Sequence, residues 1–216
     1  QESSNSLGKA EINRIINDVF TIEDIRKEKP PVHPSNEGEV LGQYHALRTA
    51  QKSRAELKFS DGSLARIGSD AFFSFSADKR DVQTGKGTAL FQVPKGSKET
   101  NVRTATATAS LTGTTLMVNQ QPDQHVKAAV IEGSVNVSMP DRVGESRSLQ
   151  AGEMIVMPTD AERLPEPVDV DLQELVSTSG LINDFNEEED EEESTDESQG
   201  TDESSDENAT QEEGSA

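Results

Sequence analysis

Histidines and paired carboxylates are the side chains from which a metal site or an acid–base pair could be built in this sequence. The three histidines are His33, His45 and His125, and none has a second ligand at the spacing of a known metal site. His33 lies in a proline-rich loop, and the other two lie where strands are expected to begin. We therefore interpret all three as surface or structural residues and predict no metal site.

Two further patterns resemble catalytic or nucleotide-binding motifs. Asp61 and Asp70 could form a pair of catalytic carboxylates, but Asp61 precedes Gly62, and Asp-Gly is typical of a tight hairpin turn. The segment Gly85–Thr88 resembles a phosphate-binding loop, although the earlier glycine is absent and the lysine is followed by glycine. No G-x-S-x-G elbow of a serine hydrolase occurs. The sequence thus predicts a protein that is not an enzyme and has no cofactor.

The composition excludes several classes of function. The 216-residue chain has no cysteine, which excludes disulfides, zinc–thiolate sites and thiol catalysis. It has no tryptophan and one tyrosine, so carbohydrate binding on large aromatic platforms is disfavoured. The formal net charge of −21 argues against binding to nucleic acid. After Phe185 there are 15 acidic and no basic residues. Such a segment cannot bury enough apolar surface to offset the entropy of ordering, so we predict disorder there.

The elements that must position any site are short strands. The stretch Gly85–Val118 is punctuated by glycine and proline, and within it Thr104–Ala109 alternates threonine and alanine with the period of a half-buried strand. Residues 54–59 also alternate, with alanine, leucine and phenylalanine on one face and charged residues on the other. Residues 10–22 fit a helical spacing too, but their β-branched residues favour one or two strands. Strand-like segments recur at roughly the spacing of a β-sandwich or closed roll.

We predict an all-β fold: a single jelly-roll-like β-sandwich or roll with a short C-terminal helix and a disordered acidic tail. Asp169 or Asp171 is the expected cap of the helix. Leu181, Ile182 and Phe185 are expected to dock on the β body. In chain order the predicted divisions are a disordered N-terminus over 1–9, leading strands and a proline-rich loop over 10–39, the β domain over 40–158, an extension with the helix over 159–185, and the tail over 186–216.

Five segments in series resemble the FecR domain. They are SRAEL at 53–57, DGS at 61–63, VRTATA at 102–107 with the following Gly113-Thr114, EGSVNV at 132–137, and LQAGE at 149–153. The resemblance covers roughly residues 40–158 and implies a jelly-roll-like sandwich located outside the cytoplasm. In the iron-citrate type of regulator, such a domain receives a signal from an outer-membrane receptor and controls a sigma factor. No anti-sigma helix bundle is recognised in this sequence, so we expect a stand-alone, exported FecR-domain protein.

The motif residues are interpreted as structural. The glycines lie where the backbone must turn or kink between strands, and the threonine is expected to hydrogen-bond a neighbouring loop. The residues concerned are Asp61, Gly62, Gly113, Thr114, Glu132, Gly133, Gly152 and Glu153. The loops at Arg80 and at Lys95 to Lys98 concentrate positive charge on an acidic protein. We predict that Arg80, Lys95 and Lys98 belong to an interaction surface.

These observations predict a non-catalytic, extracytoplasmic protein-interaction or envelope signalling module, with a protein partner in the cell envelope. A secreted glycan-binding or hydrolytic β-sandwich protein is the alternative. No apolar run approaches the ~20 residues of a membrane helix. The chain starts at Gln1, not at methionine, from which we expect removal of a signal peptide, a fragment cut from a longer chain being the other interpretation.

Overall fold

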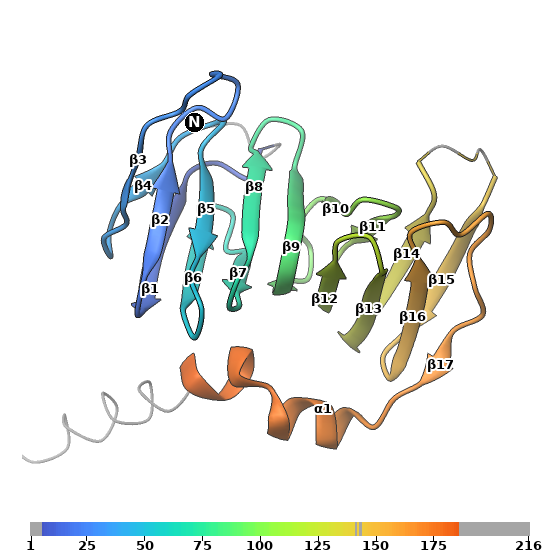
Figure 1. Ribbon diagram of the computed structural model, residues 1–216. Coiled ribbons are helices and arrows are strands. Elements are labelled where there is room, and N and C mark those ends of the chain that lie inside the picture. The colour runs from blue at the N-terminus through green and yellow to red at the C-terminus, as the bar shows by residue number, and fades with distance from the viewer. Residues whose placement is uncertain (1–5, 141, 143, 186–216) are drawn as a thin grey trace, which may run out of the picture.

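The protein is built from two antiparallel sheets that share one long strand, as the computed structural model shows for residues 6–140, 142 and 144–185 (Figure 1). In the described part of the chain, the exception to antiparallel pairing is the parallel pair β9–β10. Sheet A has the order β4 (Val40–Leu41), β1 (Ala10–Ile16), β6 (Arg54–Phe59), β7 (Leu64–Ile67), β9 (Asp81–Gln92), β12 (Thr115–Gln121), β13 (His125–Glu132), β16 (Glu153–Pro158) and β17 (Val168–Asp169).

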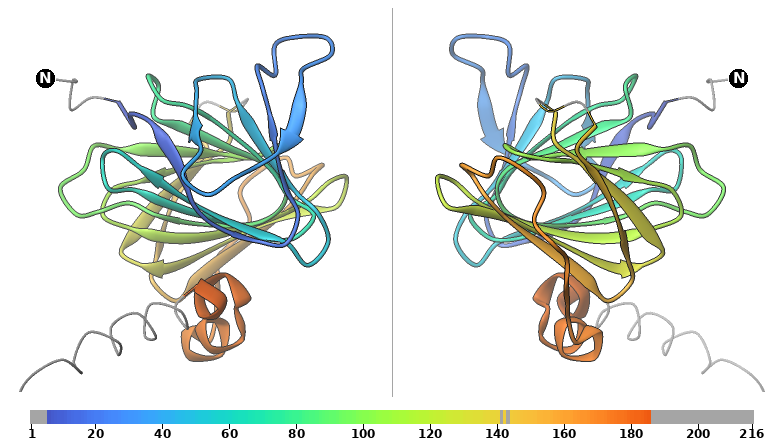
Figure 2. Two further views of the ribbon diagram at one scale, coloured as in Figure 1. Left: turned by 90° about the vertical axis from the view of Figure 1, so that its left-hand side faces the viewer. Right: turned by 90° about the vertical axis from the view of Figure 1, so that its right-hand side faces the viewer.

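Sheet B begins at the proline-rich loop and shares β9 with sheet A. Its order is β3 (Val32–Pro34), β2 (Val19–Ile22), β5 (Ala46–Thr49), β8 (Phe72–Ser76), β9, β10 (Thr100–Arg103), β11 (Thr108–Leu111), β14 (Ser134–Ser138) and β15 (Ser146–Gln150). The end-on views in Figure 2 show the strands enclosing one interior. The prediction of an all-β body with a short C-terminal helix is confirmed.

Strand β9 passes from one sheet to the other at Gly85-Lys86-Gly87. Residues up to Lys86 pair with β8 of sheet B, and residues from Gly87 onward pair with β12 of sheet A. Gly87 has φ +86°, and a Cβ there would lie 2.6 Å from the Cβ of Ala71. Glycine supplies this conformation and this close approach without steric cost. The segment that resembles a phosphate loop is therefore a bend between two sheets.

Aromatic side chains fill the space between the sheets. Phe73 is fully buried, and Phe59, Phe75 and Phe91 are nearly so. The rings of Phe59 and Phe75 meet edge to face with centroids 5.5 Å apart, a geometry that aromatic quadrupoles favour. Phe73 and Phe91 lie 6.2 Å apart from centroid to centroid. The phenylalanines therefore act as core residues that join β6 and β8 to the shared strand.

The prediction of a strand through Thr104–Ala109 is wrong for its first four residues. Residues 104–107 form the connection between β10 and β11, and Thr104 N–H donates to the Ala107 carbonyl at 2.9 Å. The Thr104 hydroxyl accepts from Ala107 N–H at 3.0 Å. Threonine side chains can bond nearby backbone in this way and so compete with a strand ladder. Local hydrogen bonding thus overrides the alternation of the sequence.

The two ends of the described chain are attached to the β body. Leu7 is fully buried and its N–H donates to the Ala77 carbonyl at 3.1 Å, so the prediction of disorder over 1–9 is wrong for residues 6–9. The short helix α1 (Leu172–Thr178) is capped by Asp171, whose carboxylate accepts from Glu174 N–H. Residues 180–185 are helical and lie beside the β body (Figure 1).

The predicted disordered tail over 186–216 and residues 1–5 lie outside the described residues. Within the described ranges, the helices are all too short and too polar to cross a membrane.

Candidate functional site

Motif residues from three of the five segments converge on the loop of residues 94–99, which follows β9 and is called the motif loop below. Thr114 is 1% exposed, and its N–H and C=O pair with the backbone of Val93 at 3.1 and 3.0 Å. Its hydroxyl donates to the Ser134 carbonyl at 2.9 Å. The prediction that Thr114 bonds a neighbouring loop is confirmed. Thr114 thereby joins the start of the motif loop to the turn between β13 and β14.

Gly133 and Gly113 allow these two turns to touch. Gly133 has φ +80°, and a Cβ on it would lie 2.8 Å from the Gly113 carbonyl oxygen. A Cβ on Gly113 would in turn lie 3.0 Å from Cγ of Lys95 in the motif loop. The interpretation of these glycines as positions of chain reversal fits this packing, since no side chain could be added without moving backbone.

Arg80 holds the other side of the motif loop and is a buried residue, only 5% exposed. Its guanidinium donates to the carbonyls of Lys98 and Glu99, both at 3.1 Å, and to the Thr100 hydroxyl at 2.9 Å. It also donates to the Ser6 carbonyl at 3.0 Å and forms a 2.6 Å ion pair with Asp61. The prediction of Arg80 as part of an exposed interaction surface is therefore wrong.

The Asp61-Gly62 turn between β6 and β7 completes this support. Asp61 accepts from the N–H of Ser63 at 2.9 Å, as in a hairpin turn fixed by its own side chain, and from Arg80. A Cβ on Gly62 would lie 3.5 Å from Cγ of Pro94, at the start of the motif loop. Because its carboxylate is used in this way, Asp61 is a structural acid. Asp70 lies in a separate turn after β7 and is exposed.

The outer side of the motif loop carries the two lysines. The Lys95 side chain is 82% exposed and pairs with Glu132 at 3.1 Å across a shallow depression of about 240 Å³. Lys98 is also exposed. Motif residues therefore fix the loop from within, while its solvent side presents Lys95 and Lys98.

Gly152 and Glu153 lie apart from the contacts that hold the motif loop. Gly152 lies in the turn between β15 and β16, and Glu153 begins β16, where its carboxylate accepts from Gln150 N–H at 2.7 Å. The hairpin at 149–153 is also bonded to the neighbouring turn, because Ala151 N–H donates to the Gly133 carbonyl at 3.0 Å and Gly152 N–H donates to the Val130 carbonyl at 2.9 Å.

Replacing Thr114 by valine is expected to lower the free energy of unfolding by about 1–2 kcal/mol, because the bond to Ser134 is removed in a buried position. Urea unfolding monitored by circular dichroism measures this change. Thr112→Val, at an exposed position two residues earlier, should stay within about 0.5 kcal/mol of the parent chain. Equal effects of the two substitutions would show that the Thr114 hydroxyl does not support the loop.

The three histidines have structural surroundings in the described part of the chain. His45 Nδ1 accepts from Gly42 N–H at 3.2 Å, and His33 Nε2 lies 3.1 Å from a Glu39 oxygen. His125 Nε2 is buried without a hydrogen-bond partner. No group of three or more metal-ligating side chains occurs among the residues that the structure describes.

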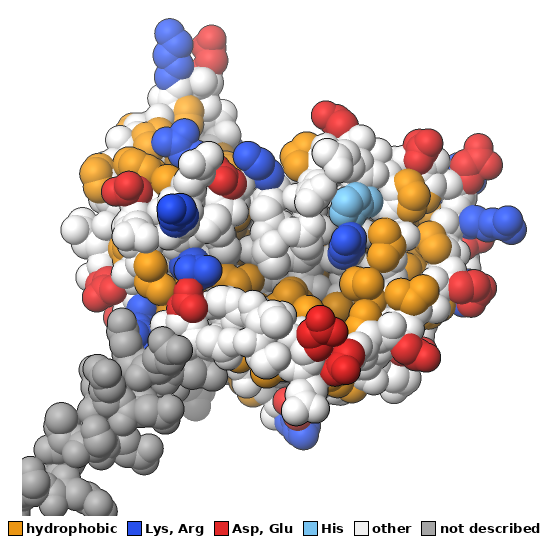
Figure 3. Space-filling model, turned by 60° about the horizontal axis from the view of Figure 1, so that its bottom comes forward, with side chains coloured by type: hydrophobic (Ala, Val, Ile, Leu, Met, Phe, Trp, Pro, Cys, Tyr) orange, Lys and Arg blue, Asp and Glu red, His pale blue; other side chains and the backbone are white. Residues whose placement is uncertain are grey.

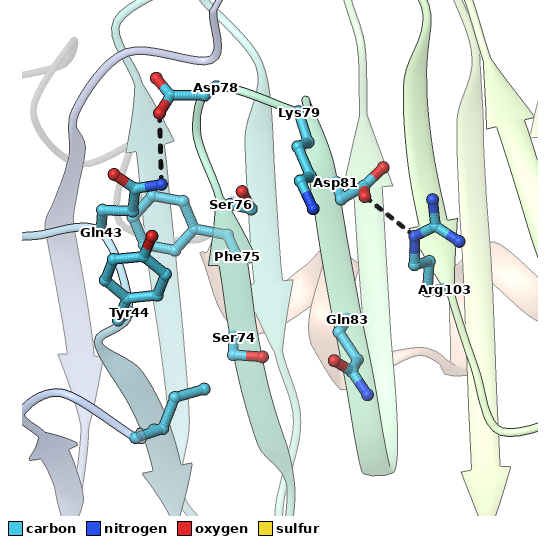
Figure 4. Close-up of a pocket in the computed structure, with 11 residues that line it drawn as sticks. Gln43, Tyr44, Ser74, Phe75, Ser76, Asp78, Lys79, Asp81, Gln83 and Arg103 are labelled. Atoms are coloured by element: carbon cyan, nitrogen blue, oxygen red, sulfur yellow. Dashed lines mark hydrogen bonds and ion pairs between the residues drawn. The ribbon is translucent and has the colours of Figure 1, made fainter. Parts of the chain in front are cut away.

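A polar groove on the outer face of sheet B is a feature that sequence reasoning missed (Figure 4). It has a volume of about 450 Å³. Arg103 and Asp81 form a 2.9 Å ion pair on one side, and Gln43 donates to Asp78 at 3.2 Å on the other. Tyr44 lies beside Gln43. The segments that line the groove are far apart in the chain and share no motif, so no local signal marks it.

The loop that supplies Tyr44 is held by a charged stack. The Arg26 guanidinium lies 3.6 Å from the centroid of the Tyr44 ring, a cation–π contact. Arg26 also pairs with Asp24, donating from Nε to Oδ1 at 2.7 Å. This hydrogen bond is the main reason that the pKa of Asp24 lies below its ordinary value, since it stabilises the carboxylate.

Substituting Arg26 by glutamine is therefore expected to raise the pKa of Asp24 toward its ordinary value. Because the pKa in the folded chain is lowered, the pair stabilises the fold above the unfolded-state pKa, and this contribution is lost as the pH falls through the folded-state pKa. An NMR titration of the Asp24 side-chain carboxyl carbon measures both values. An unchanged midpoint in Arg26→Gln would contradict the pairing.

Comparisons with known proteins bear on the fold and on the motif segments. A family model described as FecR protein matches residues 45–136, which is less than half of the chain. Two crystal structures of a candidate anti-sigma factor from Parabacteroides distasonis, at 1.65 and 2.50 Å resolution, have 22% identity and a TM-score of 0.51. The match covers 60% of this chain and 62% of that chain, so less than two thirds of the neighbour is spanned.

At this identity the neighbour shows a shared fold. A search of curated proteins found no match. The matched segment includes the Asp61-Gly62 turn, Thr114 and Gly133, whereas the hairpin at 149–153 lies beyond it. The sequence of the segment 45–136 matches the FecR protein family, as the series of motifs predicted.

Proposed function

We propose that this chain is a non-catalytic, extracytoplasmic FecR-domain protein that acts in envelope signalling by binding a protein partner through the motif loop. The observation that carries the proposal is how the motif side chains are used. The motif residues Thr114 and Asp61, together with Arg80, are engaged with backbone or with one another, and they hold a loop that presents Lys95, Lys98 and Glu99 to solvent. Residues arranged in this way shape a recognition surface and leave no convergent group for catalysis.

Charge supports a protein partner at this loop. On a chain with a net charge of −21, the motif loop carries the exposed Lys95 and Lys98 against the exposed Glu99, two positive charges to one negative, and Lys95 also pairs with Glu132. Such a local excess of positive charge steers and orients an acidic partner more than it adds raw affinity. The FecR match and the fold shared with a candidate anti-sigma factor favour signalling over other roles, and the FecR resemblance favours a location outside the cytoplasm.

The alternative of a glycan-binding or hydrolytic protein would use the polar groove. Tyr44 is the aromatic side chain of that groove that could stack on a sugar, but Arg26 lies on its ring at 3.6 Å. The two carboxylates that line the groove are engaged elsewhere: Asp81 pairs with Arg103 at 2.9 Å, and Asp78 accepts from Gln43 at 3.2 Å. These contacts favour the protein-binding proposal.

A photo-crosslinking amino acid at position 97, between the two lysines, tests the proposal in cells of the source organism. We expect one discrete adduct of higher mass after irradiation, recovered with the envelope fraction. The matched control places the same amino acid at Lys29, in the exposed connection between β2 and β3. The same crosslinked adducts from positions 97 and 29, or no adduct from either position, would contradict the proposal. Recovery in the cytoplasmic fraction would contradict the location.

A further inference from the structure

A row of cross-strand neighbours crosses the outer face of sheet A. Arg14 of β1 pairs with Glu56 of β6, Glu56 with Arg66 of β7, Arg66 with Leu90 of β9, and Leu90 with Met117 of β12. The row is charged at one end and apolar at the other. Arg54 flanks it, two residues before Glu56 on β6. We call Arg14, Arg54 and Arg66 the arginine face.

Residues 180–185 of the same chain occupy this face. Arg66 donates to the carbonyls of Leu181 and Ile182 at 3.3 and 3.4 Å, and Arg14 donates to the Phe185 carbonyl at 2.7 Å. These guanidinium groups thus donate to three backbone carbonyls of the helical residues 180–185.

Side chains of the segment add three further contacts. Asp184 forms a 2.5 Å ion pair with Arg54. Phe185 is fully buried, with the Arg66 guanidinium 5.1 Å from its ring centroid. Leu181 packs with Leu90 in a small apolar cluster that is separate from the main core. This side of sheet A therefore contacts an apolar residue, an acid and an aromatic residue, in that order along the helical segment: Leu181, Asp184 and Phe185.

Helix α1, which connects the β body to this segment, packs little against the rest of the protein. None of the residues of α1 is buried. Figure 3 views the molecule from the side on which this segment lies. Release of the segment would return water to the Glu56–Arg66 pair, whose side chains are only 2% and 12% exposed while covered. Because desolvation penalises a buried ion pair, rehydration of these two charges would offset part of the free energy needed to release the segment.

We propose that the arginine face is a binding site for a short acidic helical segment of a partner protein, carrying the leucine–acid–phenylalanine order of residues 181–185. The chain's own segment fills the site as an internal competitor that the partner displaces. Charge complementarity indicates the chemistry, because the face carries three arginines and one glutamate, Glu56, and Arg54 already pairs with an acid of the segment, Asp184. The site is separate from the motif loop, so its failure would leave the proposal for that loop unaffected.

A labelled peptide with the sequence of residues 177–189 tests this assignment in trans. It is titrated against the full chain and against the full-length double variant Leu181→Ala/Phe185→Ala, in which the internal competitor is weakened. We expect the apparent Kd to be at least about tenfold lower for the variant, because an occupied site reduces apparent affinity by its free fraction. Fluorescence anisotropy provides the measurement, and circular dichroism checks the fold. Asp184→Arg, which sets two cations together at Arg54, is a second way to empty the site.

A charge swap supplies the matched control. Adding Arg54→Asp to the emptied variant should abolish binding of the parent peptide, and a peptide carrying Asp184→Arg should restore it. Equal affinity for the parent chain and both emptied variants, or no rescue by the swapped peptide, would overturn the proposal. A parent chain that forms a dimer by exchanging residues 180–185 would also overturn it, by assigning the face to a second copy.

Discussion

Replacing Arg80 by methionine is expected to lower the free energy of unfolding by about 3–5 kcal/mol, the cost of removing one partner of a buried, hydrogen-bonded ion pair. The guanidinium is the shared donor for Asp61 and for the carbonyls of Ser6, Lys98 and Glu99. Methionine fills much of the same volume without donating, so the carboxylate and carbonyls are left without this donor in a position with little water. Urea unfolding followed by circular dichroism measures the destabilisation.

Arg103→Met is the matched control for this change. Arg103 also pairs with an aspartate, at 2.9 Å, but its side chain is 47% exposed. Exposed pairs contribute about 0–1 kcal/mol, so the control should remain close to the parent chain. If the two substitutions had equal and small effects, Arg80 would not organise the start of β10 and the motif loop.

Gly133→Ala is expected to destabilise the fold by about 3 kcal/mol, through two effects in one position. The folded turn holds residue 133 at φ +80°, a conformation that L-residues rarely adopt. The added methyl carbon would also lie 2.8 Å from the Gly113 carbonyl oxygen and 3.2 Å from the Thr114 hydroxyl. Either the backbone turns or the two motif segments separate. Thermal and urea unfolding of the variant measure the sum of these costs.

Gly96→Ala separates the two effects. Gly96 lies in the motif loop with φ +85°, and a Cβ there would meet no atom within 4 Å. It therefore carries the conformational cost alone, about 1–2 kcal/mol. A difference of about 1 kcal/mol or more between the two variants would measure the contact of Gly133 with the Gly113-Thr114 turn. No difference would mean that this contact is not tight in solution.

Much of the β body could be predicted because each strand carries its pattern locally. Ala55, Leu57 and Phe59 alternate with charged residues, and β6 forms where that alternation predicts it. The same pattern failed at residues 104–107, where threonine bonds to the backbone of its own turn. Alternation predicts which side chains would share a face of a strand. It does not predict whether a polar side chain will instead hydrogen-bond nearby backbone and form a turn.

The site was only half predictable for a related reason. The Asp61-Gly62 turn and the Gly113-Thr114 pair carry local chemistry, so their roles followed from residue type. The role of Arg80 could not be inferred from its residue type, because its hydrogen-bond acceptors come from residue 6, from the β6–β7 turn and from residues 98–100. Alternation places Glu56 on the charged face of its strand, yet it is 1% exposed, and its carboxylate accepts from Arg66 and from Asn13.

We propose that the FecR motif residues and Arg80 hold the motif loop in place and that its exposed lysines contact a protein partner. The most direct measurement is the yield of the position-97 crosslinked adduct in a chain that also carries Lys95→Glu and Lys98→Glu. We expect the free energy of unfolding to stay within about 1 kcal/mol of the parent chain, because both lysines are exposed and the lost Lys95–Glu132 pair is an exposed one, while the adduct disappears. An adduct retained at the parent yield by the folded variant would contradict it.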